Sequence, residues 1–418
     1  MPLRFVRKGK FVLPESTLAR PGVVIGEAGS GKTETLLRLA FAAALVYGYY
    51  VLYLDAKGDR TTAARFVAAM WAAGRRCVKV FPYSPYYGWI GDADTLFSRL
   101  MAVQSYSEEY YKWIASLMVN LTLNFPGGPP RSSEDFLEHL TLDQLFIDYR
   151  GCREEREVNR INAHDANGVY NRYRAFFKAL RGRLDQGFTI DDIDAAYILL
   201  DGIAFREETS SIGRFLMEDI AHYVSRRKSL EKKVLIIVDE VSALAITNIV
   251  NLVERLRAFG GTVFLSSQTQ EGLAATQNER DRILGTAHTL ILHTSNSPER
   301  IVVRAGKNKQ VNQRWNVLNQ QHTGSGTVQL QDDNLIPPDN VRRLGVGEVY
   351  IIVNGYAHKV CIAPVEITPE GLQDAFRFLE EEERAAVTLQ TDSNPTPLPT
   401  ACNPPSNEQQ RPAEPEGI

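Results

Sequence analysis

The stretch that decides the fold is "GEAGSGKT", residues Gly26 to Thr33, which matches the phosphate-loop pattern GxxxxGK[ST]. A short apolar segment, "GVVI" (22–25), precedes it, and a helix-like segment, "TETLLRLAFAAALVYG", begins at Thr33. In this order, backbone N–H groups of the turn and the positive end of the helix can hold phosphates. The motif therefore predicts a nucleotide site formed by Gly26, Glu27, Ala28, Gly29, Ser30, Gly31, Lys32, Thr33 and Glu34.

Two side chains of this loop have distinct expected roles. The ammonium group of Lys32 neutralises the β and γ phosphates, and the hydroxyl of Thr33 coordinates Mg²⁺. The alternative is a glycine turn that binds no ligand, but the flanking strand and helix argue against it. ATP and Mg²⁺ are the expected cofactors.

Outward from the loop, short apolar strands alternate with helical segments. "YVLYLD" (50–55) and "CVKVFPY" (77–83) are expected strands, and "TAARFVAAMWAAG" (62–74) between them is an expected helix. This alternation indicates an α/β fold in which a mostly parallel sheet has helices on both faces.

Helical periodicity replaces the alternation from about residue 92 to 195, which indicates an all-helical domain inserted into the α/β domain. The tail is rich in Pro, Asn and Gln and almost free of large apolar residues, so we expect it to be disordered. The predicted organisation is 1–91 and 196–366 for the two parts of the ATPase domain, 92–195 for the insertion, 367–389 for a C-terminal helix and 390–418 for the tail.

The segment "VLIIVDE" (234–240) places two acidic residues at the end of a buried strand. Asp239 is expected to hold the Mg²⁺ shell, and Glu240 to orient the attacking water and accept its proton. A phosphotransferase must exclude water and has little use for Glu240. The pair therefore favours hydrolysis.

The segment "GGTVFLSSQTQ" (260–270) is a strand that ends in hydroxyl and amide side chains. In a parallel sheet, ligands lie beyond the carboxyl ends of the strands. Gln268 would then lie within reach of the γ-phosphate, with an amide that can both donate and accept hydrogen bonds. We expect it to sense the γ-phosphate; the alternative is a strand that frays into solvent.

Composition limits the other classes of protein. A net charge of −3 with 23% charged residues excludes a polycation that coats nucleic acid. A local basic surface that binds nucleic acid is still compatible with this net charge. The first residues lack the apolar core of a signal peptide, and the longest apolar run, 39–55, is better explained by a buried helix and strand than by a membrane span. We therefore expect a cytoplasmic protein without direct membrane insertion.

Together with "LDAKGD" (54–59) and "RAFGGTVFLSSQTQ" (257–270), these motifs resemble those of the FtsK/HerA group of DNA-pumping ATPases. Within that group the sequence is most similar to the coupling proteins of conjugation and type IV secretion. The shared features are a D-x-K-G-[DE] element, an R-x-x-G element before the glutamine strand, a helical insertion and a late strand, "GEVYIIV.G" (347–355). The resemblance covers roughly residues 15–365.

The resemblance implies a RecA-like P-loop NTPase core and a hexameric ring. It also implies ATP-driven movement of single- or double-stranded DNA through the central pore, without sequence specificity. Arg257 is by the same argument the arginine finger that reaches the γ-phosphate of a neighbouring subunit, with Arg280 and Arg282 as alternatives. A solvated helix face is the other explanation for Arg257.

The resemblance has one departure. Membrane-anchored coupling proteins carry N-terminal transmembrane helices, and none is recognisable in this sequence. Either a membrane-bound or secretion-channel partner recruits the protein to the inner face of the cell membrane, or the protein works as a soluble translocase.

Two basic segments are candidates for contact with DNA phosphates. "ERIVVRAGKNKQVNQR" (299–314) contains Arg304, Lys307 and Lys309, and "RYRAFFKALRGR" (172–183) contains Arg174 and Lys178 at helical spacing. Solvated surface is the alternative for both.

The leading functional hypothesis is a hexameric ATPase that pumps DNA, in conjugative transfer or a related DNA-processing step. The alternative is a secretion-type ATPase that moves protein substrates or energises a secretion channel, because such enzymes share the phosphate loop and the acidic pair. Stimulation of ATP hydrolysis by DNA separates the two.

Overall fold

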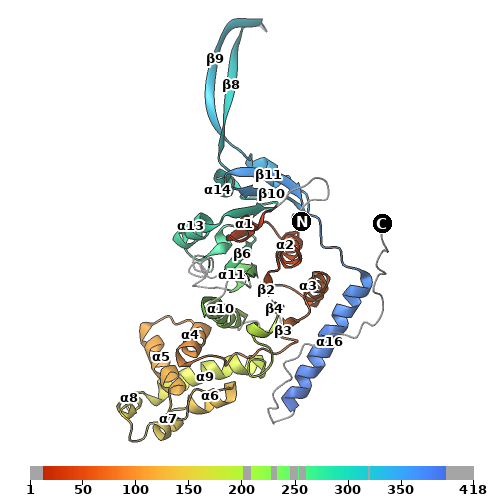
Figure 1. Cartoon of the computed structure of the whole chain (residues 1–418). Coiled ribbons are helices and arrows are strands. Elements are labelled where there is room, and N and C mark those ends of the chain that lie inside the picture. The colour runs from red at the N-terminus through yellow and green to blue at the C-terminus, as the bar shows by residue number, and fades with distance from the viewer. Residues whose placement is uncertain are drawn as a thin grey trace, which may run out of the picture.

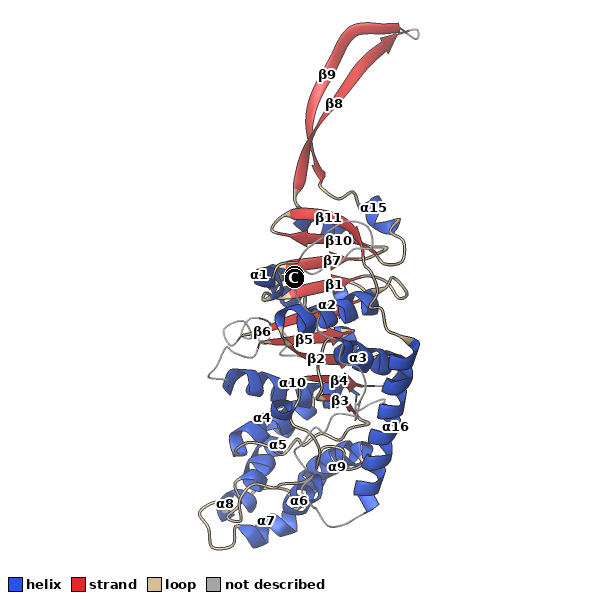
Figure 2. Ribbon diagram, turned by 45° about the vertical axis from the view of Figure 1, so that its right-hand side comes forward, coloured by secondary structure: helices blue, strands red, loops and turns tan. Residues whose placement is uncertain are grey.

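A nine-stranded sheet forms the centre of the computed structural model, which describes residues 13–200, 209–226, 233–244, 253, 260–318 and 321–391. The strand order is β11-β10-β7-β1-β6-β5-β2-β4-β3 (Figure 2). The strands are β1 (Gly22–Ile25), β2 (Tyr50–Asp55), β3 (Val78–Phe81), β4 (Ala195–Leu199), β5 (Val234–Asp239), β6 (Gly261–Ser267), β7 (Thr289–Leu292), β10 (Glu348–Val353) and β11 (Tyr356–Cys361). Only the β7–β10 and β10–β11 pairings are antiparallel within this sheet, so the predicted mostly parallel α/β fold is confirmed.

The two faces of the sheet bury alternate residues of each strand, as the period of two requires. Val24 and Leu235 belong to one hydrophobic core, and their chain neighbours Val23 and Ile236 belong to the other. The first core is covered by α2 (Lys32–Tyr47), α3 (Arg60–Ala72) and α16 (Pro369–Thr391). Beyond the core contacts, Glu382 and Glu383 of α16 form ion pairs with Lys79 and Arg60.

The second core extends from the opposite face of the sheet into helices from the middle of the chain. These are α4 (Ala93–Val103), α5 (Glu109–Leu123), α6 (Ser133–His139), α7 (Leu142–Asp148), α8 (Glu155–Val158), α9 (Ala163–Leu180), α10 (Thr209–Arg226) and α13 (Gln277–Thr286). Helices α4 to α9 gather below the sheet in Figure 1, between β3 and β4 in the chain. Their buried residues, such as Leu100 and Phe176, form one continuous core with Leu52 of the sheet. A buried ion pair between Arg99 and Asp219 joins α4 to α10.

A long two-stranded ribbon was not predicted from the sequence. Strands β8 (Lys307–Leu318) and β9 (Gln321–Asn334) pair antiparallel and project away from the β10–β11 edge of the sheet (Figures 1 and 2). Residues 299–314 were interpreted only as a basic segment that could contact DNA, with no strand expected there. Instead, that segment contains α14 (Glu299–Val302), the 3₁₀ turn η5 (Val303–Ala305) and the start of β8.

Short helices complete the described chain: α1 (Glu15–Leu18), η1 (Ile190–Asp192), α11 (Val241–Leu244), η4 (Glu271–Leu273) and α15 (Pro338–Arg342). Across the described ranges, no helix is both long enough and apolar enough to cross a membrane. The tail predicted to be disordered lies outside the described residues from position 392 onward.

Candidate active site

The predicted phosphate loop joins the end of β1 to the start of α2. Gly29 and Gly31 have φ angles of 75° and 96°, a backbone conformation that glycine adopts without steric cost. Ala28 and Gly29 at the tip are exposed, whereas Ser30 is buried. The loop therefore combines a tight curve with an open tip, as a phosphate-binding loop requires.

Lys32 is folded into this loop. Its Nζ donates hydrogen bonds to the carbonyl oxygens of Gly26 and Glu27, at 2.5 and 2.9 Å. Burial lowers the pKa of the Lys32 ammonium, although the charges of Asp239 and Glu240 oppose this shift. Because both present acceptors are neutral, a phosphate group would be a stronger hydrogen-bond partner for the ammonium.

The two predicted Mg²⁺ ligands meet at the edge of the sheet. Thr33 Oγ1 lies in the first turn of α2 and donates to Asp239 Oδ2, at the end of β5, over 3.3 Å. Asp239 also accepts a hydrogen bond from the Tyr53 hydroxyl at 3.1 Å. Burial raises the pKa of the Asp239 carboxyl. A divalent cation beside this carboxylate would favour its ionised form.

The "DAKGD" segment follows β2, and its polar positions have separate contacts. Asp55 accepts hydrogen bonds from the backbone N–H groups of Lys57 and Gly58, at 2.9 and 2.6 Å. A Cβ atom on Gly58 would lie 2.1 Å from the Asp55 carboxylate, so the site requires glycine. Asp59 caps the N-terminus of α3. The motif thus fixes the turn that carries Lys57 toward the active site.

Two carboxylates and two tyrosines form a buried group beside this turn. Asp55 and Asp239 are register partners on β2 and β5. The Tyr197 hydroxyl donates to Asp55, and the Tyr53 and Tyr197 rings stack with centroids 5.0 Å apart. Burial and the charge of Asp239 raise the pKa of Asp55 to about 6. The repulsion between the carboxylates makes this edge of the sheet favourable for a cation.

Glu240, the predicted base, is held by three side chains. Ser242 Oγ donates to its Oε1 at 2.6 Å, Gln268 Nε2 donates to its Oε2 at 3.1 Å, and Lys57 Nζ lies 3.3 Å from Oε2. Burial acts to raise the pKa of Glu240, but these hydrogen bonds and the lysine charge outweigh it, so the pKa lies below its ordinary value. Glu240 also has a φ of 57°, which is uncommon for a residue other than glycine. Its carboxylate is therefore ionised at neutral pH and fixed in direction.

Gln268 directly follows β6, and the strand end is well ordered by contacts. Ser266 and Ser267 are fully buried, which contradicts the alternative of a strand that frays into solvent. The Ser267 carbonyl accepts a hydrogen bond from the Gly26 N–H at 3.3 Å and so joins β6 to the phosphate loop. The structure brings Gln268 to Glu240; its action on a γ-phosphate stays a prediction.

His293 directly follows β7, and its ring is buried between the phosphate loop and α2. The buried ring lies 2.9 Å from the Ser30 carbonyl through Nδ1 and 3.0 Å from Thr35 Oγ1 through Nε2. Burial lowers the pKa of His293 to about 4, so the ring is neutral. A carbonyl only accepts, so Nδ1 carries the proton and Nε2 accepts from Thr35. The ring therefore joins the phosphate loop to α2, a contact that the sequence pattern did not indicate.

The acidic residues of the loop contact protein groups. Glu34 forms a two-pronged ion pair with Arg65 of α3, with one N–O distance of 2.9 Å. Glu27 Oε1 accepts the backbone N–H of Asn296 at 2.6 Å. Gly347 donates its N–H to the Ser30 carbonyl at 3.1 Å. These contacts position the loop, and the partners from the 296 and 347 regions were not identified from sequence.

Arg257, the predicted arginine finger, lies outside the described residues. The two alternatives, Arg280 and Arg282, both lie on α13. Arg280 is half-buried and donates to the Thr276 carbonyl at 3.2 Å, whereas Arg282 is exposed.

The predicted DNA-contact residues fall into two separate groups, one on α9 below the sheet and one at the base of the ribbon beside β10 and β11 (Figure 1). Arg174 and Lys178 are exposed on α9. Lys307 and Lys309 are exposed at the base of β8, and Arg304, also exposed, donates to the Leu284 carbonyl of α13 at 2.5 Å. The two groups therefore do not form one continuous surface on a single subunit.

The side chains at the carboxyl edge of the sheet fit ATP and Mg²⁺. Lys32 is placed among backbone oxygens that a phosphate can replace, and the Thr33 and Asp239 oxygens are adjacent. No cluster of three or more His, Cys, Asp or Glu residues forms a metal site within the described chain. The remaining ligands of a Mg²⁺ ion here would be phosphate oxygens and water, which is the usual arrangement for this ion.

Comparison with known proteins gives similarity of structure at low sequence identity. No family model and no curated protein matches the sequence. The unbound bacterial conjugative coupling protein TrwBΔN70 is 15% identical, with a TM-score of 0.63 over 87% of this chain and 89% of that chain. The plasmid coupling protein TrwB in complex with ADP and Mg²⁺ is also 15% identical, with a TM-score of 0.64 over 88% and 90% of the chains.

VirB4 of Thermoanaerobacter pseudethanolicus is a third similar structure, with 13% identity and a TM-score of 0.56 over 89% of this chain and 98% of that chain. At these identities the similarity establishes the fold. The RecA-like P-loop NTPase fold that the resemblance implied is confirmed, and so is the structural similarity to coupling proteins.

Proposed function

We propose that this protein is an ATP hydrolase that drives DNA through a ring of identical subunits. The observation that carries the proposal is the convergence of Lys32, the Thr33–Asp239 pair and the Glu240–Gln268 pair at one edge of the sheet. Its fold is shared with the plasmid coupling protein TrwB, which was solved in complex with ADP and Mg²⁺ and in complex with a non-hydrolysable ATP analogue. Conjugative DNA transfer, or a related DNA-processing step, is the process that this fold favours.

The chemistry that we assign to the site is hydrolysis of the γ-phosphate. Bound Mg²⁺ supplies positive charge to the phosphate oxygens. Lys32 binds the β and γ phosphates, and Glu240 orients the attacking water and accepts its proton. The low pKa of Glu240 keeps its carboxylate ionised, and Gln268, hydrogen-bonded to that carboxylate, links the base to the γ-phosphate.

The ring requires a contribution from the neighbouring subunit, which we assign to Arg257. A mixing experiment tests this assignment. Arg257→Ala and Lys32→Ala subunits are each expected to be inactive alone, and their mixture is expected to regain part of the ATP turnover, because each variant damages a different half of the shared site. Absence of rescue would count against Arg257 and favour Arg280 or Arg282.

DNA as the transported substrate is tested by ATP turnover in the presence of single- and double-stranded DNA. We expect stimulation by at least one of them, and electron microscopy with DNA and an ATP analogue is expected to show six subunits in a ring. An ATPase that no DNA stimulates would instead be assigned to the movement of protein substrates. Recruitment to a membrane-bound or secretion-channel partner is part of the same proposal.

A further inference from the structure

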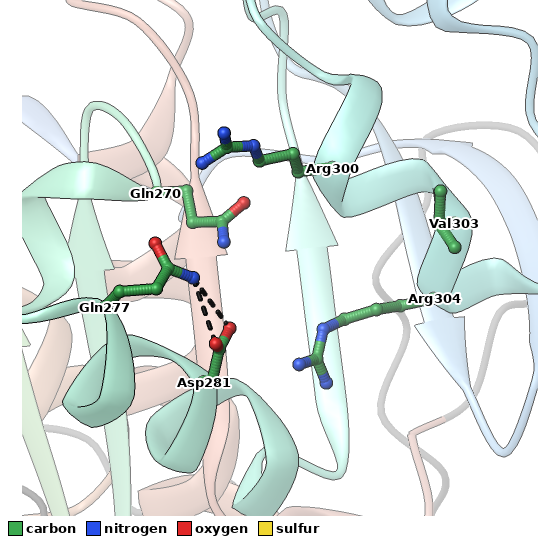
Figure 3. A pocket seen from close by; sticks show the side chains of 6 residues that line it. All are labelled: Gln270, Gln277, Asp281, Arg300, Val303 and Arg304. Carbon is green, nitrogen blue, oxygen red and sulfur yellow. Dashed lines mark hydrogen bonds between the residues drawn. The ribbon is translucent and has the colours of Figure 1, made fainter.

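A pocket outside the candidate active site lies between η4, α13 and the α14–η5 turn (Figure 3). Its volume is about 530 Å³, within the range of small-ligand sites. The lining residues are Gln270, Gln277, Asp281, Arg300, Val303 and Arg304. No phosphate-loop residue lines it, so this pocket is separate from the site for ATP.

Gln270 gives the pocket an unsatisfied hydrogen-bond acceptor. The residue is only 7% exposed, and its Oε1 has no hydrogen-bond partner in the described structure. Its amide group faces into the pocket in Figure 3. A buried acceptor without a donor is unfavourable, so a ligand with an N–H or O–H group would be stabilised here.

Arg300 gives the pocket an available positive charge. Its guanidinium is exposed and forms neither an ion pair nor a hydrogen bond with any described residue. The adjacent Glu299 does not neutralise it, because Glu299 pairs with Arg342. Asp281 on the facing helix accepts two hydrogen bonds from Gln277 Nε2, both at 3.0 Å. Arg300 is therefore free to bind an anionic group.

The ligand must combine an anion for Arg300 with a donor for Gln270. A carboxylate group by itself has no donor, and inorganic phosphate, although it carries an O–H group, is small for the volume. A nucleotide carries a phosphate and a base whose edge donates hydrogen bonds, and glutamine amides are well suited to base edges. Val303, which is 50% exposed, offers an apolar surface to the base. We propose that this pocket binds one nucleotide unit of a DNA strand.

A basic path continues from the pocket along the chain. Arg304 forms part of its wall, and the exposed Lys307 and Lys309 follow at the start of β8. Successive phosphates of a strand can be held by such a series, whereas a free nucleotide has no use for it. This continuity favours a strand over a free nucleotide, and the proposal rests on the DNA-moving function proposed above.

The pocket is connected to the catalytic glutamate through η4. A Cβ atom on Gly272 would lie 2.3 Å from Ser267 Oγ and 3.3 Å from Ser242 Cβ, so this turn packs directly against both residues. Ser242 donates to Glu240, and so does Gln268, two residues before Gln270. Movement of η4 when Gln270 binds a nucleotide therefore alters two contacts of Glu240, which couples strand binding to ATP hydrolysis.

Arg300→Ala in the full chain tests the pocket. The control is Arg76→Ala, which also removes one exposed arginine, but near β3 at the opposite edge of the sheet. Affinity for a fluorescent single-stranded oligonucleotide is measured at several salt concentrations, and ATP turnover with and without that oligonucleotide. Arg300→Ala is expected to bind roughly tenfold more weakly, with a salt slope lower by about one. Arg76→Ala is expected to match the wild type.

Gln270→Ala is expected to lose most of the stimulation of ATP turnover by the oligonucleotide.

Two failures are distinguishable. A wild-type enzyme that neither binds nor responds to DNA overturns the proposed function, and this inference with it. A wild-type enzyme that responds to DNA while Arg300→Ala and Gln270→Ala respond equally well overturns the pocket alone. Binding of dAMP is measured in the Lys32→Ala background, which removes the main phosphate contact of the ATP site. Arg300-dependent binding of dAMP without binding of the oligonucleotide would overturn the strand as the ligand.

Discussion

The active-site edge of the sheet and the β8–β9 ribbon place their charged groups in opposite environments. At the edge, Asp55, Asp239 and Glu240 are buried, and each accepts hydrogen bonds from fixed donors. The ribbon stands away from the sheet and exposes Lys307 and Lys309 at its base (Figure 2). A two-stranded ribbon has little stability of its own. Fixed charges suit catalysis, whereas exposed charges on a projecting element suit contact with a partner.

Removal of the buried ammonium group should give the largest effect. Lys32→Ala deletes the only side chain of the loop whose charge is directed at the phosphate position, so we expect ATP turnover to fall by about 10³-fold. Binding of a fluorescent ATP analogue should fall as well. Lys112→Ala on α5, where Lys112 is 56% exposed, is the control and should be unchanged. Equal loss in both variants would contradict the special role of the buried charge.

Glu240→Gln should separate nucleotide binding from hydrolysis. Glutamine preserves the size of the side chain but does not accept the proton of the attacking water, so turnover should fall by about 10²–10³-fold. ATP binding should remain within a few-fold of the wild type, because Lys32 and Thr33 are unchanged. Near-normal phosphate release would refute Glu240 as the base.

The active-site edge could be predicted because its residues are fixed by local sequence. A strand followed by Gly26–Thr33, and a strand ending in Asp239–Glu240, place their side chains through backbone geometry alone. Contacts between distant segments were not predictable in the same way. The His293 ring between Ser30 and Thr35 depends on β7 lying beside β1, which a single sequence does not specify.

The ribbon was missed for a related reason. Strands are recognised by alternating apolar residues with turn signals between them, and β8 begins "KNKQVNQR", with almost no apolar alternation. The helical periodicity of residues 92–195 gave a clear signal, and helices α4 to α9 lie there. The sequence pattern did not show that these helices share one hydrophobic core with the sheet, because that packing depends on side chains far apart in the chain.

The free energy of unfolding should depend on pH through Asp55. This dependence tests the buried charge of the active-site edge, in contrast to the exposed charges of the ribbon. Its pKa of about 6 lies above the ordinary 3.8, so the folded protein binds this proton more tightly than the unfolded chain. The contribution of Asp55 to the free energy of unfolding is therefore complete below pH 3.8 and is lost as the pH rises through 6. The loss is at most about 3 kcal/mol.

Urea unfolding of the nucleotide-free protein at a series of pH values between 4 and 7 measures this contribution. Asp55→Asn stays neutral and should show a smaller loss of stability over that range than the wild type. It also loses the acceptor for the Tyr197 hydroxyl, so the slope with pH, and not the absolute stability, is the relevant quantity. Parallel slopes for the two proteins would show that the pKa of Asp55 is the same in the folded and unfolded states.

The smallest expected effects concern the exposed charges, where the two ends of the molecule can be compared directly. Lys307→Ala/Lys309→Ala should weaken binding of single-stranded DNA by roughly tenfold and lower its salt dependence. Arg174→Ala/Lys178→Ala should change the affinity by less than about twofold, since α9 is remote from the ribbon and the pocket (Figure 1).

Within the ribbon, Lys307 should contribute more than Lys309. Lys309 is the register partner of Asp332, whose charge offsets its own, whereas Lys307 is the register partner of the neutral Asn334. Single variants measured at low salt distinguish the two lysines. If the α9 variant loses more affinity than the ribbon variant, DNA contacts the helical end of the molecule, and the exposed lysines of the ribbon must serve another partner.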